Sequence, residues 1–189
     1  MPGEVIYIVT DGEFDGPIPG INSMLSFAAV AVTADQGIIS EFEAVLQRLD
    51  GASQNDKTMA FWQTEPEAYA AATHDPEPPN VVMKRFVEWV RNLSGVPVFM
   101  SHPLALDGIW IDFYLRRFTE EQLLEGPWNT ERLFHFALCL ASYAAGKLGR
   151  HIVDYGNYPP EWLGNIPHTH RAIDDARGYA HLLIHLLKP

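Results

Sequence analysis

Apolar and β-branched residues form three short runs in the first quarter of the chain. Residues 4–10 have the sequence EVIYIVT and are followed by Asp11, where the run stops. Two more runs span residues 24–32 and 38–46 and are joined by the sequence ADQG. Short apolar runs bounded by Gly, Pro and Asp are typical of buried strands, and a tight turn joins antiparallel neighbours. The pattern therefore predicts that the first three strands of the fold pair antiparallel.

The rest of the chain shows mainly helical spacing, with one further apolar strand at residues 96–100. Helices are predicted at residues 58–63, 66–72, 81–93, 107–118, 131–146 and 172–187. Strands followed by mixed strands and helices indicate an α/β fold, in which a mixed β-sheet is flanked by helices. Ligands of such sheets gather at the carboxyl ends of the strands, so we expect the functional site there.

Length and composition favour one soluble domain over residues 1–189. The chain is 47% hydrophobic and 20% charged, and no apolar run approaches the roughly 20 residues that a membrane-spanning helix needs. The N-terminus lacks the pattern of a signal peptide, and the single cysteine cannot form an internal disulfide. We therefore expect a cytoplasmic protein without membrane contact.

The formal net charge of −11 argues against broad capture of duplex DNA, because Lys and Arg drive that binding. Bound divalent cations would reverse the local field if several acidic residues were metal ligands. The charge therefore favours short or single-stranded nucleic acids over long duplexes.

Acidic residues occur at three places that the predicted elements could bring together. Asp11 and Glu13 follow the first strand, and Asp107 lies in the first turn of a predicted helix. Near the C-terminus, His170 precedes the last helix and Asp175 lies near its start. Each pattern alone is weak evidence, because Asp-x-Glu also occurs in solvated turns and an acidic residue near a helix start is stabilised by the helix dipole. Their order and context together indicate a functional site.

These patterns resemble the motifs of the DnaQ-like (DEDDh) 3'-5' exonucleases, and the resemblance covers nearly the whole chain. The first motif is Asp-x-Glu at the end of the first strand, matched by Asp11 and Glu13. In the second motif, His-Asn precedes an apolar residue and Asp; His102 and Asp107 match it, but Pro103 stands where Asn is usual. The resemblance implies an RNase H-like fold.

The third motif of the family is a His followed after four residues by Asp, and His170 and Asp175 match it. The segment TMAFW at residues 58–62 also resembles the Thr-Leu-x-x-Trp segment of small bacterial and phage exonucleases. Among family members, the chain is most similar to small stand-alone exonucleases and exoribonucleases.

The family chemistry is a two-metal hydrolysis of phosphodiester bonds. The resemblance implies that two Mg²⁺ or Mn²⁺ ions are held by four carboxylates, of which Asp11 bridges both ions, and oxygen ligands suit these hard cations. His170 would act as the general base, since imidazole titrates near neutral pH. The four expected metal ligands, also counted as catalytic, are Asp11, Glu13, Asp107 and Asp175.

Several neighbouring residues compete for these roles. Asp112 lies on the same predicted helix as Asp107, but Asp107 is preferred because it is at the helix start. His168 competes with His170, and only His170 has the family spacing. Asp174 competes with Asp175, yet side chains of adjacent helical residues point about 100° apart, so a structural role is predicted for Asp174.

Three residues are expected to contact the substrate. Phe14 is expected in a loop that follows the first acidic pair, where its ring could stack on an unpaired base, which contributes roughly 1 to 3 kcal/mol. His102 belongs to the second motif, and Met24 begins the second strand. Trp110 and Phe113 are aromatic too, but they are predicted to pack in the core.

The remaining candidates favour structural roles. His181 and His185 have a spacing that can bind zinc, but the last helix supplies no third ligand. We expect these histidines at the surface or at the helix C-terminus, where the helix dipole favours them. Cys139 is expected to be a buried apolar residue.

The leading hypothesis is a 3'-5' exonuclease that releases nucleoside 5'-monophosphates from the 3' ends of single-stranded RNA or DNA. RNA is slightly favoured, because the chain is short and similar to the stand-alone members, and family analogy predicts a homodimer. Two alternatives remain: a nuclease fold that has lost catalysis and serves as an interaction module, and a metal phosphoesterase for small nucleotides or sugar phosphates. Pro103 and the net charge of −11 motivate the interaction module.

Overall fold

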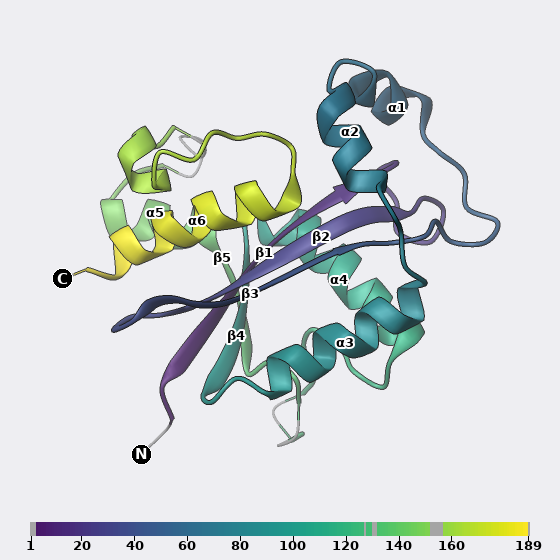
Figure 1. The fold of residues 1–189 in the computed structure, drawn as a ribbon. Helices are drawn as coiled ribbons and strands as arrows, with labels where there is room; N and C mark the ends of the chain where they lie inside the picture. Colours follow the sequence, from purple (N-terminus) through teal and green to yellow (C-terminus); the bar gives the residue numbers. More distant parts are fainter. Residues whose placement is uncertain (1–2, 127, 130–131, 152–156, 189) are drawn as a thin grey trace.

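The computed structural model describes residues 3–126, 128–129, 132–151 and 157–188. Its centre is a five-stranded sheet with the order β3-β2-β1-β4-β5 (Figure 1). The bounds of these strands are β1 Val5–Phe14, β2 Met24–Thr33, β3 Gly37–Val45, β4 Val96–Ser101 and β5 Phe136–Cys139. β1, β2 and β3 pair antiparallel, whereas β4 and β5 run parallel to β1. The expected mixed sheet, with its first three strands antiparallel, is confirmed.

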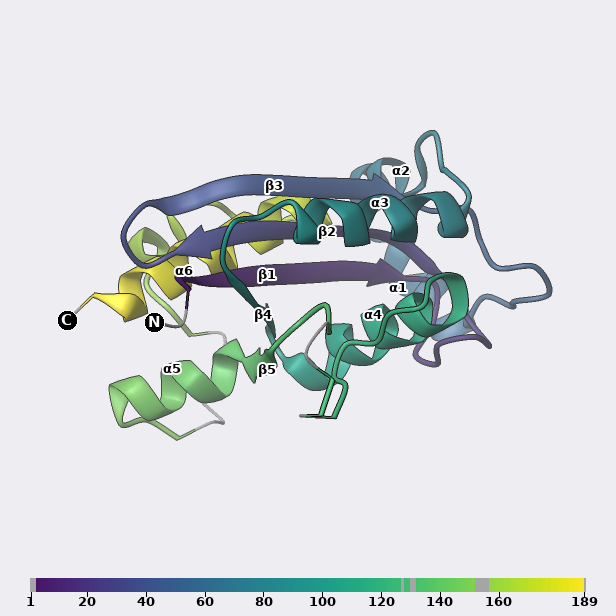
Figure 2. The same cartoon turned by 90° about the horizontal axis from the view of Figure 1, so that it is seen from below.

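Helices cover both faces of this sheet. In Figures 1 and 2, α6 lies across one face, and α3 and α4 lie on the opposite face. Two short helices, α1 and α2, stand near the carboxyl end of β1 (Figure 1). The bounds of the helices are α1 Asp56–Trp62, α2 Pro66–Thr73, α3 Pro79–Arg91, α4 Leu104–Phe118, α5 Leu140–Leu148, the 3-10 helix η2 Pro160–Leu163 and α6 Ala172–Leu187.

The alternation of side chains along the strands produces two cores. Ile6 and Ile8 of β1 pack with the aromatic residues of β2, β3 and α3. Val9 packs on the other face with Leu183 of α6. Because successive residues of a strand point to opposite faces, the same alternation decides which acidic side chains of β1 meet α6.

β1 is longer than the sequence pattern predicts. It continues through the acidic residues to Phe14, since Asp11 is paired with Ala28 and Glu13 with Ser26 in the antiparallel ladder with β2. The expectation that the strand stops at Asp11 is therefore wrong. β2 is buried along its whole length, so its backbone N–H and C=O groups need hydrogen-bond partners in the neighbouring strands. The pairing of β1 with β2 therefore continues through Asp11 and Glu13, although acidic residues are usually expected in a turn.

The predicted helix at residues 131–146 is also wrong in its first half. Phe136–Cys139 forms strand β5, which pairs with β4, and α5 begins only at Leu140; residue 131 lies outside the described residues. Short apolar runs fit a strand or a helix equally well, and the open edge of β4 favours the strand. The other elements follow the prediction closely, and α6 has the predicted bounds. Among the described residues, no helix combines the length and apolar character needed to cross a bilayer.

Candidate metal centre

Asp11 and Glu13 lie on the same face of β1. They continue the alternation of Val9, whose side chain packs against α6, so both carboxylates point toward the N-terminal end of that helix. Gly12 between them faces the α4 side. A Cβ atom at Gly12 would lie 2.9 Å from the ring of Phe14 and 3.8 Å from Oδ1 of Asp107, so the glycine leaves room for both side chains.

Asp107 comes from the first turn of α4, which begins right after β4. Its side chain is buried, with 2% of the residue exposed. The carboxyl oxygen Oδ2 has no hydrogen-bond partner among the described residues. A buried oxygen without a partner is costly, which indicates that this carboxylate is arranged for a group that is not part of the chain.

Asp175 lies in the first turn of α6 and is held by the backbone that precedes the helix. The N–H of Thr169 donates to Oδ1 at 3.0 Å, and the N–H of His170 donates to Oδ2 at 3.1 Å. These bonds fix the carboxylate where it faces β1. Carboxyl oxygens of Asp11, Glu13 and Asp175 lie within 4.8 Å of one another.

His170 lines the same cavity as the four carboxylates. Its backbone φ of 54° lies in the left-handed region, which is unusual for a residue with a side chain. Its ring packs edge-on against Phe61 of α1, with ring centroids 5.0 Å apart. Phe61 and the hydrogen-bonded turn before α6 therefore orient the imidazole.

Burial and mutual repulsion dominate the electrostatics of this site. Burial raises the pKa of Glu13 to about 9, with further contributions from Asp175 and Asp107. Burial raises the pKa of Asp11 well above its usual value, and the charges of Asp107, Glu13 and Asp175 add to the shift. Burial also raises the pKa of Asp107 to about 7, although backbone hydrogen bonds from Asp107 and Gly12 partly oppose the shift. Carboxylates in this arrangement are stabilised as anions by a nearby cation.

The donor set fits hard divalent cations. Mg²⁺ and Mn²⁺ prefer oxygen ligands, and the cluster offers four carboxylates, one of which has an unpartnered oxygen. Among the described residues that line the cavity, none is Lys or Arg, so the chain supplies no permanent cation of its own there. These residues are suited to hold one or two divalent ions.

The cavity around the cluster has a volume of about 370 Å³ and is partly aromatic. Phe61, Trp62 and Tyr179 line it, although sequence reasoning assigned none of them to the site. The family-like segment at residues 58–62 was the available signal for the two α1 residues. Asn55 caps α1 through its side chain, and the indole N–H of Trp62 donates to the carbonyl oxygen of Phe14 at 2.9 Å, which ties α1 to the end of β1.

The three expected substrate contacts differ in position. Phe14 lines the cavity as the last residue of β1, not in a loop, and its ring stacks on Trp110 at 4.4 Å. His102 lines the cavity but is buried, and its ring stacks on Tyr179 at 4.5 Å. Met24 is fully buried in the core, so its side chain is not available to a substrate. Its position at the first residue of β2 does not reveal this burial.

The structure separates most of the competing residues. Asp112 lies away from the acidic cavity, where its carboxylate accepts hydrogen bonds from Arg116 and from the N–H of Leu123. Asp174 accepts a hydrogen bond from the hydroxyl of Thr169 and does not line the acidic cavity. His168 does line it. Both histidines therefore remain at the site.

The candidates assigned structural roles lie elsewhere. His185 stacks on Trp162 with ring centroids 4.0 Å apart, so it is packed rather than freely exposed. Cys139 is half-buried at the end of β5, so the expectation of a buried residue is wrong, because β5 is the edge strand of the sheet.

Comparison with solved structures found the same fold at low sequence identity. A 3'-exonuclease in a structure of 3'-end recognition of a histone mRNA stem-loop gives a TM-score of 0.67 at 9% identity, with 99% of this chain and 83% of that chain covered. The nuclease domain of 3'hExo, a DEDDh family member bound to rAMP, gives a TM-score of 0.65 at 10% identity, with coverages of 97% and 92%. E. coli exonuclease I in complex with a dT13 oligonucleotide gives a TM-score of 0.66 at 13% identity.

The match to exonuclease I covers 96% of this chain and 40% of the exonuclease I chain, so the present sequence spans less than half of that protein. No protein-family model and no curated protein sequence matches the chain. The structural likeness therefore establishes the fold, and the acidic cluster lies on it as a candidate metal centre. The chain has the RNase H-like fold of the DnaQ-like (DEDDh) 3'-5' exonucleases.

Proposed function

We propose that this protein is a metal-dependent 3'-5' exonuclease that hydrolyses phosphodiester bonds at the 3' ends of single-stranded nucleic acid. The observation that carries the proposal is one cavity lined by His170 and by carboxylates from β1, α4 and α6, in which oxygens of Asp11, Glu13 and Asp175 lie within 4.8 Å of one another. The chain has no need to hold these like charges together unless cations bind between them. The known activities of its structural neighbours agree with this chemistry.

Asp11, Glu13, Asp107 and Asp175 would hold two Mg²⁺ or Mn²⁺ ions, with Asp11 shared between them. Such ions stabilise negative charge on a phosphodiester during in-line displacement. His170, on the same cavity, would take the proton from the attacking water as general base. The product would be a nucleoside 5'-monophosphate.

The aromatic walls of the cavity would hold the substrate. Phe61 is 40% exposed and lines the cavity, so its ring is available to stack on an unpaired base. Phe14 is available only in part, since one face of its ring is covered by Trp110. The site would accept RNA and DNA, with RNA slightly favoured, and a homodimer in the cytoplasm is part of the proposal.

The test is degradation of 5'-labelled single-stranded RNA and DNA of equal sequence in Mg²⁺, Mn²⁺ or EDTA. We expect a ladder that shortens from the 3' end, depends on the metal and is lost in Asp11→Asn and His170→Ala. Asp112→Asn is the matched control, because it neutralises an aspartate on α4 that lies outside the acidic cavity. Intact substrates in both metals would reject the exonuclease and favour an interaction module.

Substrate length separates the exonuclease from a phosphoesterase for small nucleotides. An exonuclease should degrade oligonucleotides faster than mononucleotide diesters, because more bases contact its aromatic walls. Equal rates on both would contradict the proposed substrate class.

A further inference from the structure

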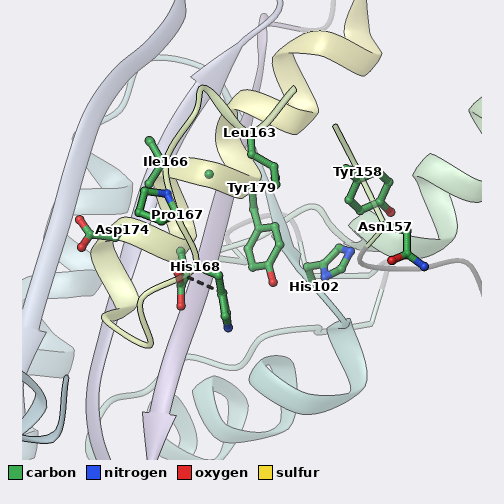
Figure 3. A pocket seen from close by; sticks show the side chains of 11 residues that line it. His102, Asn157, Tyr158, Leu163, Ile166, Pro167, His168, Asp174 and Tyr179 are labelled. Atoms are coloured by element: carbon green, nitrogen blue, oxygen red, sulfur yellow. Dashed lines mark ion pairs between the residues drawn. The ribbon is translucent and has the colours of Figure 1, made fainter. Parts of the chain in front are cut away.

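His168 places a second imidazole beside the carboxylates of the candidate metal centre. Its Nδ1 atom lies 3.1 Å from Oδ1 of Asp175, and its side chain is 56% exposed. Figure 3 shows His168 beside the start of α6, with a dashed line marking this ion pair. The ring centroids of His168 and His170 lie 4.4 Å apart. Two imidazoles and one carboxylate therefore meet at one edge of the acidic cavity.

The spacing of these groups matches a transition-metal site. One donor atom from each of His168, His170 and Asp175 lies within 4.8 Å of the other two. In a tetrahedral zinc site with bonds of about 2.0 to 2.1 Å, neighbouring ligand atoms lie about 3.3 Å apart. The distance of 3.1 Å between His168 and Asp175 is already close to that value.

We propose that His168, His170 and Asp175 form a Zn²⁺ site that is distinct from the all-carboxylate cluster. Two nitrogen donors and one oxygen donor suit zinc much better than Mg²⁺, which prefers oxygen alone. Three protein ligands leave a fourth position for water. No ligand from β1 or α4 is required, so this site does not depend on Asp11, Glu13 or Asp107.

The backbone before α6 holds the donors in place. The N–H groups of Thr169 and His170 both donate to the carboxylate of Asp175, and the left-handed conformation of His170 turns the chain between the two histidines. Because these bonds already order the carboxylate and the turn, little further ordering is needed when zinc binds.

A side cavity provides a route to this site. It has a volume of about 410 Å³, and Tyr158, Tyr179 and His102 line it together with His168 (Figure 3). His168 and Asp175 line this side cavity as well as the acidic cavity. A zinc ion can therefore reach His168 and Asp175 without passing the carboxylates of β1.

Zinc at this position would inhibit the proposed exonuclease. It would occupy the imidazole that is proposed to take the proton from water, and it would share Asp175 with the hard-cation cluster. This inhibitory consequence rests on the proposed function, whereas zinc binding itself does not. Binding and inhibition are therefore measured separately.

The binding test uses the full chain with Asp11→Asn, which weakens the carboxylate cluster and leaves the three zinc ligands unchanged. After treatment with EDTA and dialysis, the protein is titrated with ZnCl₂ in a calorimeter. We expect one zinc ion per chain, and His168→Ala in the same background should weaken binding at least about tenfold, since even loss of an outer partner of a metal ligand costs that much. His74→Ala, which removes an exposed histidine outside the cluster, should bind as the parent does.

Equal zinc affinity with and without His168 would overturn the proposal and leave the contact with Asp175 as an ion pair only. The same conclusion follows if no zinc binds. Circular dichroism of each variant checks the fold, and His168→Gln serves as a second variant if the alanine variant unfolds. In the protein with Asp11 intact, the zinc concentration that halves Mg²⁺-driven degradation should rise at least about tenfold in His168→Ala, relative to its own zinc-free rate.

The two failures are distinguishable. Zinc binding that depends on His168, without any degradation of nucleic acid, would sustain the zinc site and reject the exonuclease. Degradation that zinc inhibits equally in both proteins would sustain the exonuclease and reject the site.

Discussion

Two regions only a few residues apart bury carboxylates in opposite ways. Asp15 is fully buried, yet the N–H of Ser23 donates to its Oδ1 at 2.6 Å and Nε of Arg48 donates to its Oδ2 at 2.9 Å. Asp107 is 2% exposed, its Oδ2 has no partner among the described residues, and the neighbouring charges are the carboxylates of Asp11 and Glu13. The chain supplies Arg48 as the cation beside Asp15, whereas a cation beside Asp107 would have to come from outside the chain.

This difference separates a carboxylate with a structural role from carboxylates that are candidates for metal binding. Burying an ionised group requires a compensating charge or hydrogen bonds. Arg48 and Ser23 provide both for Asp15, so that residue contributes to the fold without a ligand. The carboxyl groups of the acidic cluster have no such compensation in the metal-free protein, so their pKa values are raised, as expected where a site is arranged for cation binding.

The largest effect should come from removing one charge of the acidic cluster. Asp107→Asn should lower the rate of 3'-end degradation at least about 100-fold, as the loss of one group that stabilises developing charge usually does. In EDTA the same variant should be at least as stable as the parent, because the substitution relieves repulsion. Gel assays and urea unfolding measure the two effects, and a variant that keeps its rate would contradict the assignment of Asp107.

The stability of the metal-free protein should depend on pH in the direction set by the cluster. In the unfolded chain these acids titrate near pH 4, whereas in the folded chain Asp107 titrates at about 7 and Glu13 at about 9. The folded state therefore retains protons that the unfolded state has lost, and stability falls as pH rises through this window. The unfolding free energy in EDTA should be lower at about pH 9 than at about pH 5.

Mn²⁺ should reverse this trend, since it binds the ionised carboxylates and stabilises the folded state more at the higher pH. Thermal unfolding at both pH values with and without Mn²⁺ checks the expectation. Equal stabilisation at both values would show that the cluster is not the binding site.

A substitution at Asp15 should change the stability of the protein and leave its metal binding unchanged. Asp15→Ala leaves the N–H of Ser23 and the guanidinium of Arg48 without their partner, which should lower the unfolding free energy by about 1 to 3 kcal/mol. Mn²⁺ affinity should stay unchanged, since Asp15 does not line the acidic cavity. Urea unfolding measures the free energy of unfolding, and calorimetry measures the Mn²⁺ affinity. A loss of Mn²⁺ binding in the folded variant would show that Asp15 also takes part in metal binding.

The smallest effect is expected at Asp112, which lies on α4 with Asp107. Its carboxylate pairs with Arg116 four residues later, an exposed arrangement that contributes only about 0.3 to 0.5 kcal/mol. Asp112→Asn keeps an oxygen that can accept the hydrogen bond from the N–H of Leu123, so it should change the unfolding free energy by no more than about 0.5 kcal/mol and leave the degradation rate unchanged. A large loss of activity in this variant would mean that the wrong aspartate of α4 has been assigned.

The fold was largely predictable from the sequence, because the buried strands and the amphipathic helices carry their own periodicity. The predicted α6 agrees in its bounds, and the three antiparallel strands agree within a few residues except at the end of β1. β5 was missed, since its four residues carry no periodic signal and pair only because β4 offers an open edge. The end of β1 was missed because its ladder with β2 extends through acidic residues.

The residues of the candidate site were predictable where they belong to a short sequence motif. Asp11, Glu13, Asp107, Asp175 and His170 line one cavity as their order suggested, and their catalytic roles remain predictions for the assays above. Met24 shows the limit of this reasoning. Met24 is the first residue of β2, the strand that pairs with the acidic end of β1, but its side chain lies in the core.

The sequence by itself determined which residues are candidates for the chemistry, because carboxylates, imidazoles and the alternation along β1 are properties of the chain. Only the tertiary structure decided which of these side chains have an ion-pair, hydrogen-bond or packing partner within the chain. Arg48 meets Asp15 from 33 residues away, and Phe61 meets His170 from a helix far from it in sequence. Contacts of this kind depend on how elements pack, and packing is set by buried surfaces distributed over the whole chain rather than by any local pattern.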